Sequence, residues 1–178
     1  MNKRMSHRFM AINILLLGVF SASVSAQDSG EIGPVIGTFD SRCVAVAYYR
    51  SEEFLAKVVE LKAEYEAALQ SGNTERADEL GILGPEQQQL AHEQVFSTGD
   101  IDEIIWMIWS ELPAVAEETG VDVIVSTWDI IYRDEMMHFV DVTDQMVMFF
   151  NPSEETLGII ESMKGVPAIP QQFLQDNN

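Results

Sequence analysis

Residues 120–135 have the sequence GVDVIVSTWDIIYRDE, which predicts a return of the chain from helix to sheet. Gly120 follows a helical pattern, and from Val121 to Ser126 valines alternate with other side chains, as in a half-buried strand. Two further strand-like pieces come next, WDIIYRD at 128–134 and MMHFVDV at 136–142. We therefore expect a strand followed by a hairpin, within a small sheet.

The helix that leads into this segment is predicted at residues 100–119, DIDEIIWMIWSELPAVAEET. Asp100 and Glu103 resemble a capping box at its start. Its apolar surface covers almost the whole circumference, because Trp106 and Trp109 lie beside the isoleucine stripe. Such a surface predicts burial from more than one side, by the core of the chain and by another subunit.

Residues 35–49, VIGTFDSRCVAVAYY, carry apolar side chains at alternate positions and predict a strand. Cys43 lies in this run and is the single cysteine, so it cannot form a disulfide within the chain. We expect a buried, inert thiol. A nucleophilic cysteine would need a basic, partly exposed setting and a His partner in a recognisable frame, which the sequence does not offer.

A helical excursion is predicted over about residues 51–119. Ser51 followed by two glutamates suits a helix start, and Gly72 suits its end. Residues 74–99 are polar, and the pair Gly84-Pro85 predicts a break into two short helical pieces.

The two ends of the chain show different patterns. Residues 1–26 combine a cationic start, an apolar stretch and small residues before Gln27, which predicts a secretory signal peptide. Its removal takes away three of the 10 Lys and Arg and none of the 29 Asp and Glu, so the formal net charge changes from −19 to −22. This charge disfavours nucleic acid and anionic membranes as partners. Residues 27–178 then form a single domain, with a flexible tail at about 166–178.

In order and spacing these segments resemble the Skp (OmpH-like) family of periplasmic proteins. The matching stretches are IGTFDSRCVAVAYYRSEEF at 36–54, GVDVIVSTWDIIYRD at 120–134 and FVDVTDQMVMFF at 139–150. The resemblance implies an α+β fold, with a small antiparallel or mixed sheet body, a shortened helical-hairpin arm and a trimeric assembly. The arm is shorter, more broken and more acidic than the long basic arms of Skp.

Apart from this resemblance, the sequence contains no recognisable catalytic motif, so we expect a non-enzymatic protein without a cofactor or a metal ion. A metal site at His138 with Asp134 and Asp141 would have a single imidazole and falls short of a zinc ligand set. Aromatic and branched residues instead predict a subunit interface or core, formed by Ile105, Trp106, Trp109, Val123, Val125, Trp128 and Tyr132.

Two functions fit these expectations. The first is a periplasmic, self-associating chaperone that binds unfolded or partly folded envelope proteins, as the resemblance implies. The second is a structural or interaction module of the cell envelope that binds one specific partner and has no chaperone activity.

Overall fold

The structure, a computed structural model, describes residues 33–170 and 173–174. The chain divides into Met1–Ile32 and Gly33–Asn178, and the description concerns the second unit. The predicted signal peptide at residues 1–26 lies outside the described residues. Within the part of the chain that is described, none of the helices combines the length and the apolar character needed to cross a membrane.

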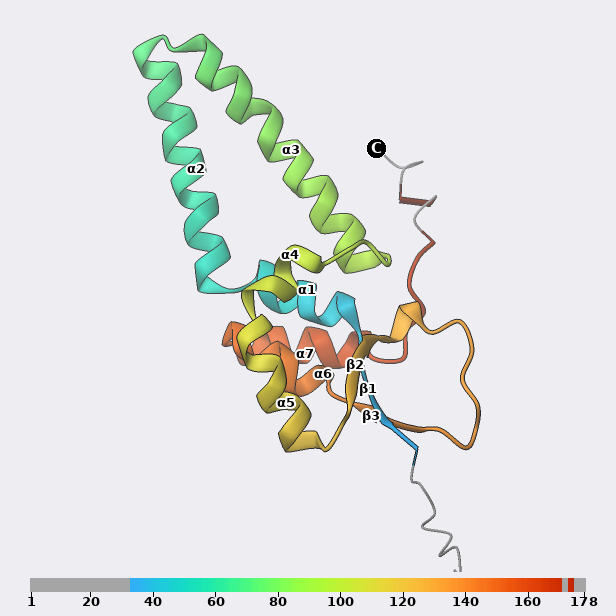
Figure 1. Ribbon diagram of the computed structural model, residues 1–178. Helices are drawn as coiled ribbons and strands as arrows, with labels where there is room; N and C mark the ends of the chain where they lie inside the picture. The colour runs from blue at the N-terminus through green and yellow to red at the C-terminus, as the bar shows by residue number, and fades with distance from the viewer. Residues whose placement is uncertain (1–32, 171–172, 175–178) are drawn as a thin grey trace, which may run out of the picture. The chain divides into compact units, whose positions relative to one another are not determined.

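The sheet has three strands, β1 (Val35–Phe39), β2 (Val123–Ser126) and β3 (His138–Asp141), in the order β2-β1-β3. Both outer strands run parallel to β1 (Figure 1). The α+β class is confirmed, but the predicted antiparallel or mixed sheet is wrong. The predicted hairpin is also wrong, because two strands parallel to a common neighbour need a connection that returns along the sheet.

Helix α1 (Ser41–Tyr49) occupies most of the segment that predicted a long strand, so that prediction is wrong beyond Phe39. Asp40 caps the helix, since its Oδ1 accepts a hydrogen bond of 3.0 Å from the backbone N–H of Arg42. Every residue from Ser41 to Ala47 is buried. A helix that is covered all round has no amphipathic period, and its small and branched residues then look like a strand.

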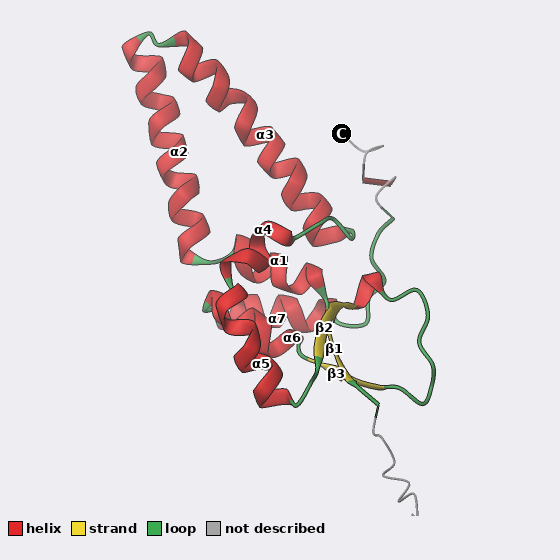
Figure 2. Cartoon of the chain, viewed as in Figure 1, coloured by secondary structure: helices red, strands yellow, loops and turns green. Residues whose placement is uncertain are grey.

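Helices α2 (Glu52–Ser71) and α3 (Thr74–Phe96) form a hairpin, called the arm below (Figure 2). The predicted start and end of α2 are confirmed: Ser51 Oγ accepts from the N–H of Phe54 at 3.2 Å, and Gly72 has φ 73°. The predicted break in α3 is wrong, because the helix continues through Pro85. Gly84 has no Cβ to meet the proline ring, which removes the main steric conflict before a proline.

Residues 100–119 form three short helices: α4 (Asp102–Met107), η1 (Trp109–Glu111) and α5 (Leu112–Thr119). Pro113 lies in the first turn of α5, where its missing N–H costs no helical hydrogen bond. The predicted single helix with a capping box of Asp100 and Glu103 is wrong: α4 begins at Asp102, and its N-cap residue, Ile101, has no side chain that can accept a hydrogen bond. Asp100 Oδ1 instead accepts from the N–H of Asp102 at 2.7 Å, a local turn contact just before the helix.

After β2 the chain forms the short helix η2 (Thr127–Asp129), and after β3 it forms α6 (Thr143–Val147), η3 (Met148–Phe150) and α7 (Glu154–Met163). Together with α1, α4 and α5 these last helices cover one face of the sheet (Figure 1). Gly37 of β1 faces them, and a Cβ there would lie 3.0 Å from Val121 Cγ2. The fully buried side chains at the centre of this core include Cys43, Val44, Val142, Met146, Val147 and Ile160.

Candidate interaction surface

The second face of the sheet is apolar and carries no packed helix among the described residues. Side chains alternate along each strand, so Phe39, Ile124 and Val140 point into the core. Their neighbours on the strands point to the other side. We define the outer face as Ile36, Val123, Val125, Ile131, Tyr132, Met137 and Phe139, which together line a hollow of about 430 Å³.

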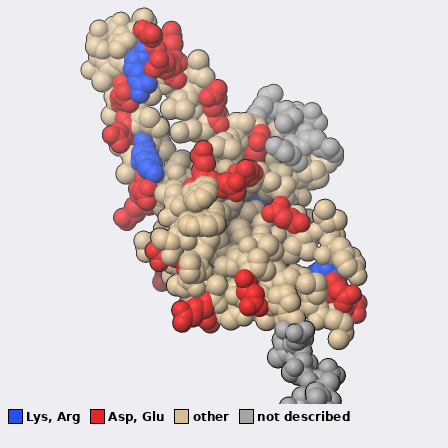
Figure 3. Space-filling model, viewed as in Figure 1, with Lys and Arg blue, Asp and Glu red and all other residues tan. Residues whose placement is uncertain are grey.

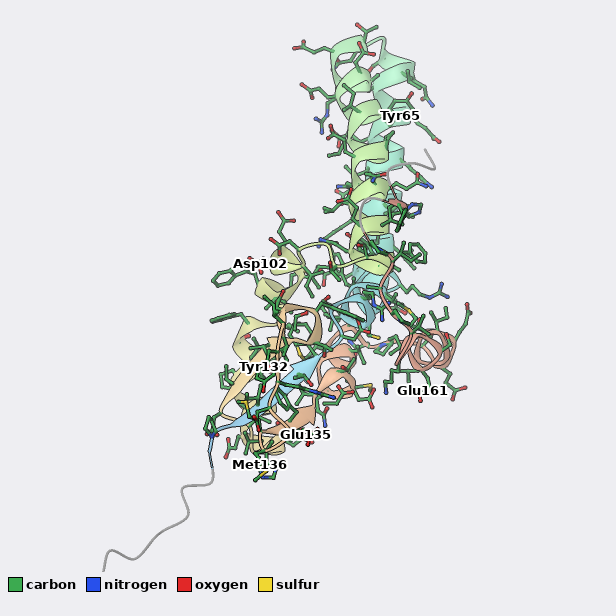
Figure 4. The ribbon with its side chains drawn as sticks, turned by 90° about the vertical axis from the view of Figure 1, so that its right-hand side faces the viewer. Tyr65, Asp102, Tyr132, Glu135, Met136 and Glu161 are labelled. Atoms are coloured by element: carbon green, nitrogen blue, oxygen red, sulfur yellow. The ribbon has the colours of Figure 1, made fainter. Side chains whose placement is uncertain are left out.

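Residues 127–137 form the connection from β2 to β3, called the return loop below. Because both strands are parallel to β1, the loop must run from the carboxyl end of β2 back to the amino end of β3. Its large apolar side chains are exposed: Ile131 is 101%, Tyr132 80% and Met136 87% accessible. Tyr132 and Met136 are labelled in Figure 4. Exposed apolar groups gathered in this way make the return loop a candidate for an interaction site.

Specific contacts are made by the start and by the middle of the return loop. At its start, the indole N–H of Trp128 donates to Asp40 Oδ1 at 3.0 Å, and the Arg42 guanidinium carbon lies 4.5 Å from the centre of the Trp128 ring system. In its middle, the Arg133 guanidinium carbon lies 5.7 Å from the Phe139 ring centre. The loop is therefore a structured part of the surface, joined to the carboxyl edge of the sheet.

A buried ion pair between Asp40 and Arg42 anchors this edge. Arg42 Nη2 lies 2.7 Å from Asp40 Oδ2, and the two side chains are only 4% and 14% exposed. Burial alone would raise the pKa of Asp40, but hydrogen bonds from Arg42 and Trp128, and the charge of Arg42, outweigh it and lower that pKa. Arg42 also donates to the carbonyl oxygen of Val166 at 2.7 Å. The carboxylate is fully engaged by donors, which indicates a structural role.

The residues of the predicted interface separate into three groups. Val123, Val125 and Tyr132 belong to the outer face. Trp106 and Trp109 stack on each other, with ring centres 4.9 Å apart and an interplanar angle of 32°. The other two residues, Ile105 and Trp128, are partly buried within the chain.

Trp106 and Trp109 remain 66% and 56% exposed, so burial in the core of this chain is excluded for them. The same holds for Tyr132, and Val123 is 45% exposed. That these residues form a subunit interface stays a prediction.

The sequence reasoning missed part of the outer face. The predicted interface did not include Ile36, Ile131, Met137 and Phe139, which also line this hollow. The segment DIIYRDEMM, residues 129–137, contained a signal: apolar and acidic residues alternate irregularly there, which fits an exposed loop better than a strand.

The alternatives for a chemical site find little support in the geometry. His138 is exposed at the start of β3. Among the described residues, no group of three or more His, Cys, Asp or Glu side chains is placed to hold a metal ion. Cys43 is buried, and burial, followed by the charge of Asp40, raises the pKa of its thiol to about 12. A thiol in this environment stays protonated and inert.

Acidic side chains outnumber basic side chains on the surface. In the view of Figure 3, carboxylate groups are spread along the arm and around the body, with few basic groups between them. The exposed apolar groups of the return loop are therefore set within an acidic surface.

Comparisons with protein-family models, with curated proteins and with solved structures found no match to this chain.

Proposed function

We propose that this protein is a non-enzymatic, Skp-like protein of the cell envelope that self-associates, as a trimer, and binds unfolded or partly folded envelope proteins. The single observation that carries the proposal is the outer face with its return loop. A chain that leaves Ile131, Tyr132 and Met136 almost completely accessible needs a partner for them.

The arm supports the same proposal. Helices of 20 and 23 residues are about 30 and 34 Å long at 1.5 Å per residue. Both are continuous, so the arm is a longer and more regular projection than its glycine and proline content predicts. Several such arms around one centre would enclose a space in which weak contacts to a client add up.

Export is part of the proposal. The cationic start and apolar stretch of residues 1–26 favour secretion and cleavage after Ala26, which would place the protein in the periplasm. Mass spectrometry of the protein recovered from the envelope of an expressing host would give its amino terminus. A chain that retains Met1 in the cytoplasm would contradict this part.

The test of the main proposal has two measurements. Analytical ultracentrifugation should give a mass near three chains, and the protein should suppress aggregation of an unfolded outer-membrane protein diluted from urea. A monomer at all concentrations would remove the basis for a shared cavity. An oligomer without suppression would contradict the chaperone activity while keeping the assembly.

The second candidate is an interaction module with one specific partner, and the Trp106–Trp109 stack favours it. Two stacked, exposed indoles provide a compact aromatic patch, and tryptophan is enriched where a few residues carry most of the binding energy. Affinity purification separates the two functions. One stoichiometric partner that is lost on Trp106→Ala would favour the module, and many weakly bound unfolded proteins would favour the chaperone.

A further inference from the structure

The arm contains a cavity of about 630 Å³ between its two helices. In Figure 1 the helices approach at the tip and diverge toward α1. Near the tip the small side chains of Ala68 and Ala77 are buried between them, which permits close contact. Further down, the walls of the cavity are apolar and aromatic, and they include Phe54, Val58, Leu61, Tyr65, Leu80 and Leu83.

One cation lines this cavity, and it has no partner among the described residues. Five of the basic residues form ion pairs: Arg42, Arg50, Lys57, Arg76 and Lys164. Arg133 lies over the Phe139 ring. Lys62 has neither kind of contact in the described part of the chain, although the sequence holds 29 acids against 10 bases. In so acidic a protein an unpaired lysine at an apolar cavity is a notable exception.

The remaining polar groups at the cavity point to the same ligand chemistry. Gln87 and Gln88 also line it, and neither amide has a hydrogen-bond partner among the described residues. The site thus combines an apolar interior with a few donors and one positive charge. Cavities of about 300–1,000 Å³ with this combination are typical of small-molecule sites.

We propose that the arm cavity binds a single-chain amphiphile with a carboxylate head group, such as a free fatty acid. The acyl chain lies between α2 and α3, and the carboxylate accepts hydrogen bonds from Lys62. From Phe54 to Tyr65 the lining follows about 16 Å of helix at 1.5 Å per residue, which suits an extended chain of medium length. This inference does not depend on self-association or on chaperone activity.

The charge of the surroundings makes the proposal specific. The acidic surface of the arm by itself favours cationic amphiphiles. Preference for an anionic head group must therefore come from a local contact, and Lys62 is the candidate for it. Two of the nearby carboxylates are already engaged: Glu64 pairs with Arg76 at 2.9 Å and Glu53 with Lys57 at 2.8 Å.

The test compares three amphiphiles with the same alkyl chain, by isothermal titration calorimetry below their micelle concentrations. The protein is the full-length product in the form recovered from an expressing host. Laurate should bind about tenfold more tightly than dodecanol, as one charge-assisted hydrogen bond provides. Dodecyltrimethylammonium should bind no better than dodecanol. Equal or tighter binding of the cationic amphiphile would overturn the proposal.

Variants assign the site. Lys62→Gln should weaken laurate binding about tenfold and leave dodecanol binding unchanged. Lys57→Gln is the matched control, because Lys57 is on the same helix, is exposed and does not line the cavity. An unchanged laurate affinity in Lys62→Gln, or an equal loss in Lys57→Gln, would overturn the assignment.

A second variant tests the cavity itself. Gly81 lines it, and a Cβ at Gly81 would lie 3.8 Å from the Tyr65 ring, an ordinary contact. Gly81→Leu should fill the cavity without disturbing the helix and should weaken both laurate and dodecanol at least about tenfold. Circular dichroism would confirm the helical content. A folded Gly81→Leu protein with full affinity would exclude the arm cavity as the binding site.

Discussion

At the scale of single residues, Arg42 connects more of the fold than any other polar side chain described above. It pairs with Asp40, lies over Trp128 and donates to the carbonyl of Val166, so it joins β1, the return loop and the segment after α7. Arg42→Met should lower the free energy of unfolding by about 3 kcal/mol, because it leaves Asp40 without its counter-charge in a buried site. Urea denaturation measures the change.

The matched control for this substitution is Arg50→Met. Arg50 pairs with Glu155 at 2.6 Å, but the two side chains are 40% and 77% exposed. Exposed ion pairs contribute about 0–1 kcal/mol, so this variant should change stability little. Similar losses in the free energy of unfolding of both variants would show that burial does not increase the contribution of the Arg42 ion pair to stability.

Asp40 gives the protein a pH dependence that a substitution can isolate. Its pKa is lowered in the folded protein from the ordinary value of 3.8, so its ionised form stabilises the fold above that value. The contribution is lost as the pH falls below 3.8 toward the lower folded pKa. The stability difference between wild type and Asp40→Asn should therefore be largest at neutral pH and shrink in acid.

Denaturation curves from neutral pH to about pH 3 would test this expectation. The difference between the two proteins, and not the acid sensitivity of either, is the quantity of interest, because many other carboxylates titrate in the same range. A difference that grows as the pH falls would contradict the assigned direction of the pKa shift.

At the scale of elements, the sequence predicts helices with clear caps well and predicts the sheet poorly. Ser51 and Gly72 mark helix ends at the observed positions, because caps act through local hydrogen bonds. Strand pairing depends on residues that are distant in the chain. The direction of β2 and β3 relative to β1 was therefore not accessible from local alternation.

Helix α1 shows a second reason for failure. Residues 41–47 are all buried, and from Cys43 onward every residue of α1 is apolar or aromatic, so no helical period is visible. Asp40 was the usable signal, since an aspartate directly before a helix accepts from its first N–H groups. Val44, Val46 and Tyr48 have high strand propensities, which favoured a strand over the helix that Asp40 indicates.

Pro85 provides a test within a single element. It lies inside α3, where a proline removes one helical hydrogen bond and is less favourable than alanine. Pro85→Ala should raise the free energy of unfolding by about 1–3 kcal/mol, measured by urea denaturation.

Glu86→Ala, at the next exposed position of the same helix, is the control and should stay within about 0.5 kcal/mol of wild type. A loss of stability in Pro85→Ala would mean that the proline has a packing role in the arm, beyond its effect on the helix backbone.

At the scale of the whole described unit, the parallel sheet creates the candidate interaction surface. The parallel connection from β2 to β3 contains only the short helix η2, which does not cover the outer face, and the return loop contributes the exposed side chains of Ile131 and Tyr132 to it. Val123, Val125 and Tyr132 of the predicted interface belong to the outer face, but the sequence did not predict the other residues of that face. The missing part follows from topology, which places residues 130–137 alongside the strands and not within them.

The last prediction concerns this surface as the contact between chains. Ile131→Asp places a charge at the most exposed apolar position of the outer face, where a partner would have to bury it unpaired. We expect self-association to weaken at least about a hundredfold, seen in sedimentation equilibrium as a shift toward the monomer mass. Leu55→Asp is the control, because Leu55 is also apolar and 52% exposed but lies on the arm. Unchanged mass in Ile131→Asp, or equal dissociation in Leu55→Asp, would show that the chains meet elsewhere. Dissociation of Ile131→Asp alone, with the far-UV circular dichroism of wild type, would assign the contact to the outer face, since a folded monomer has lost only its partner.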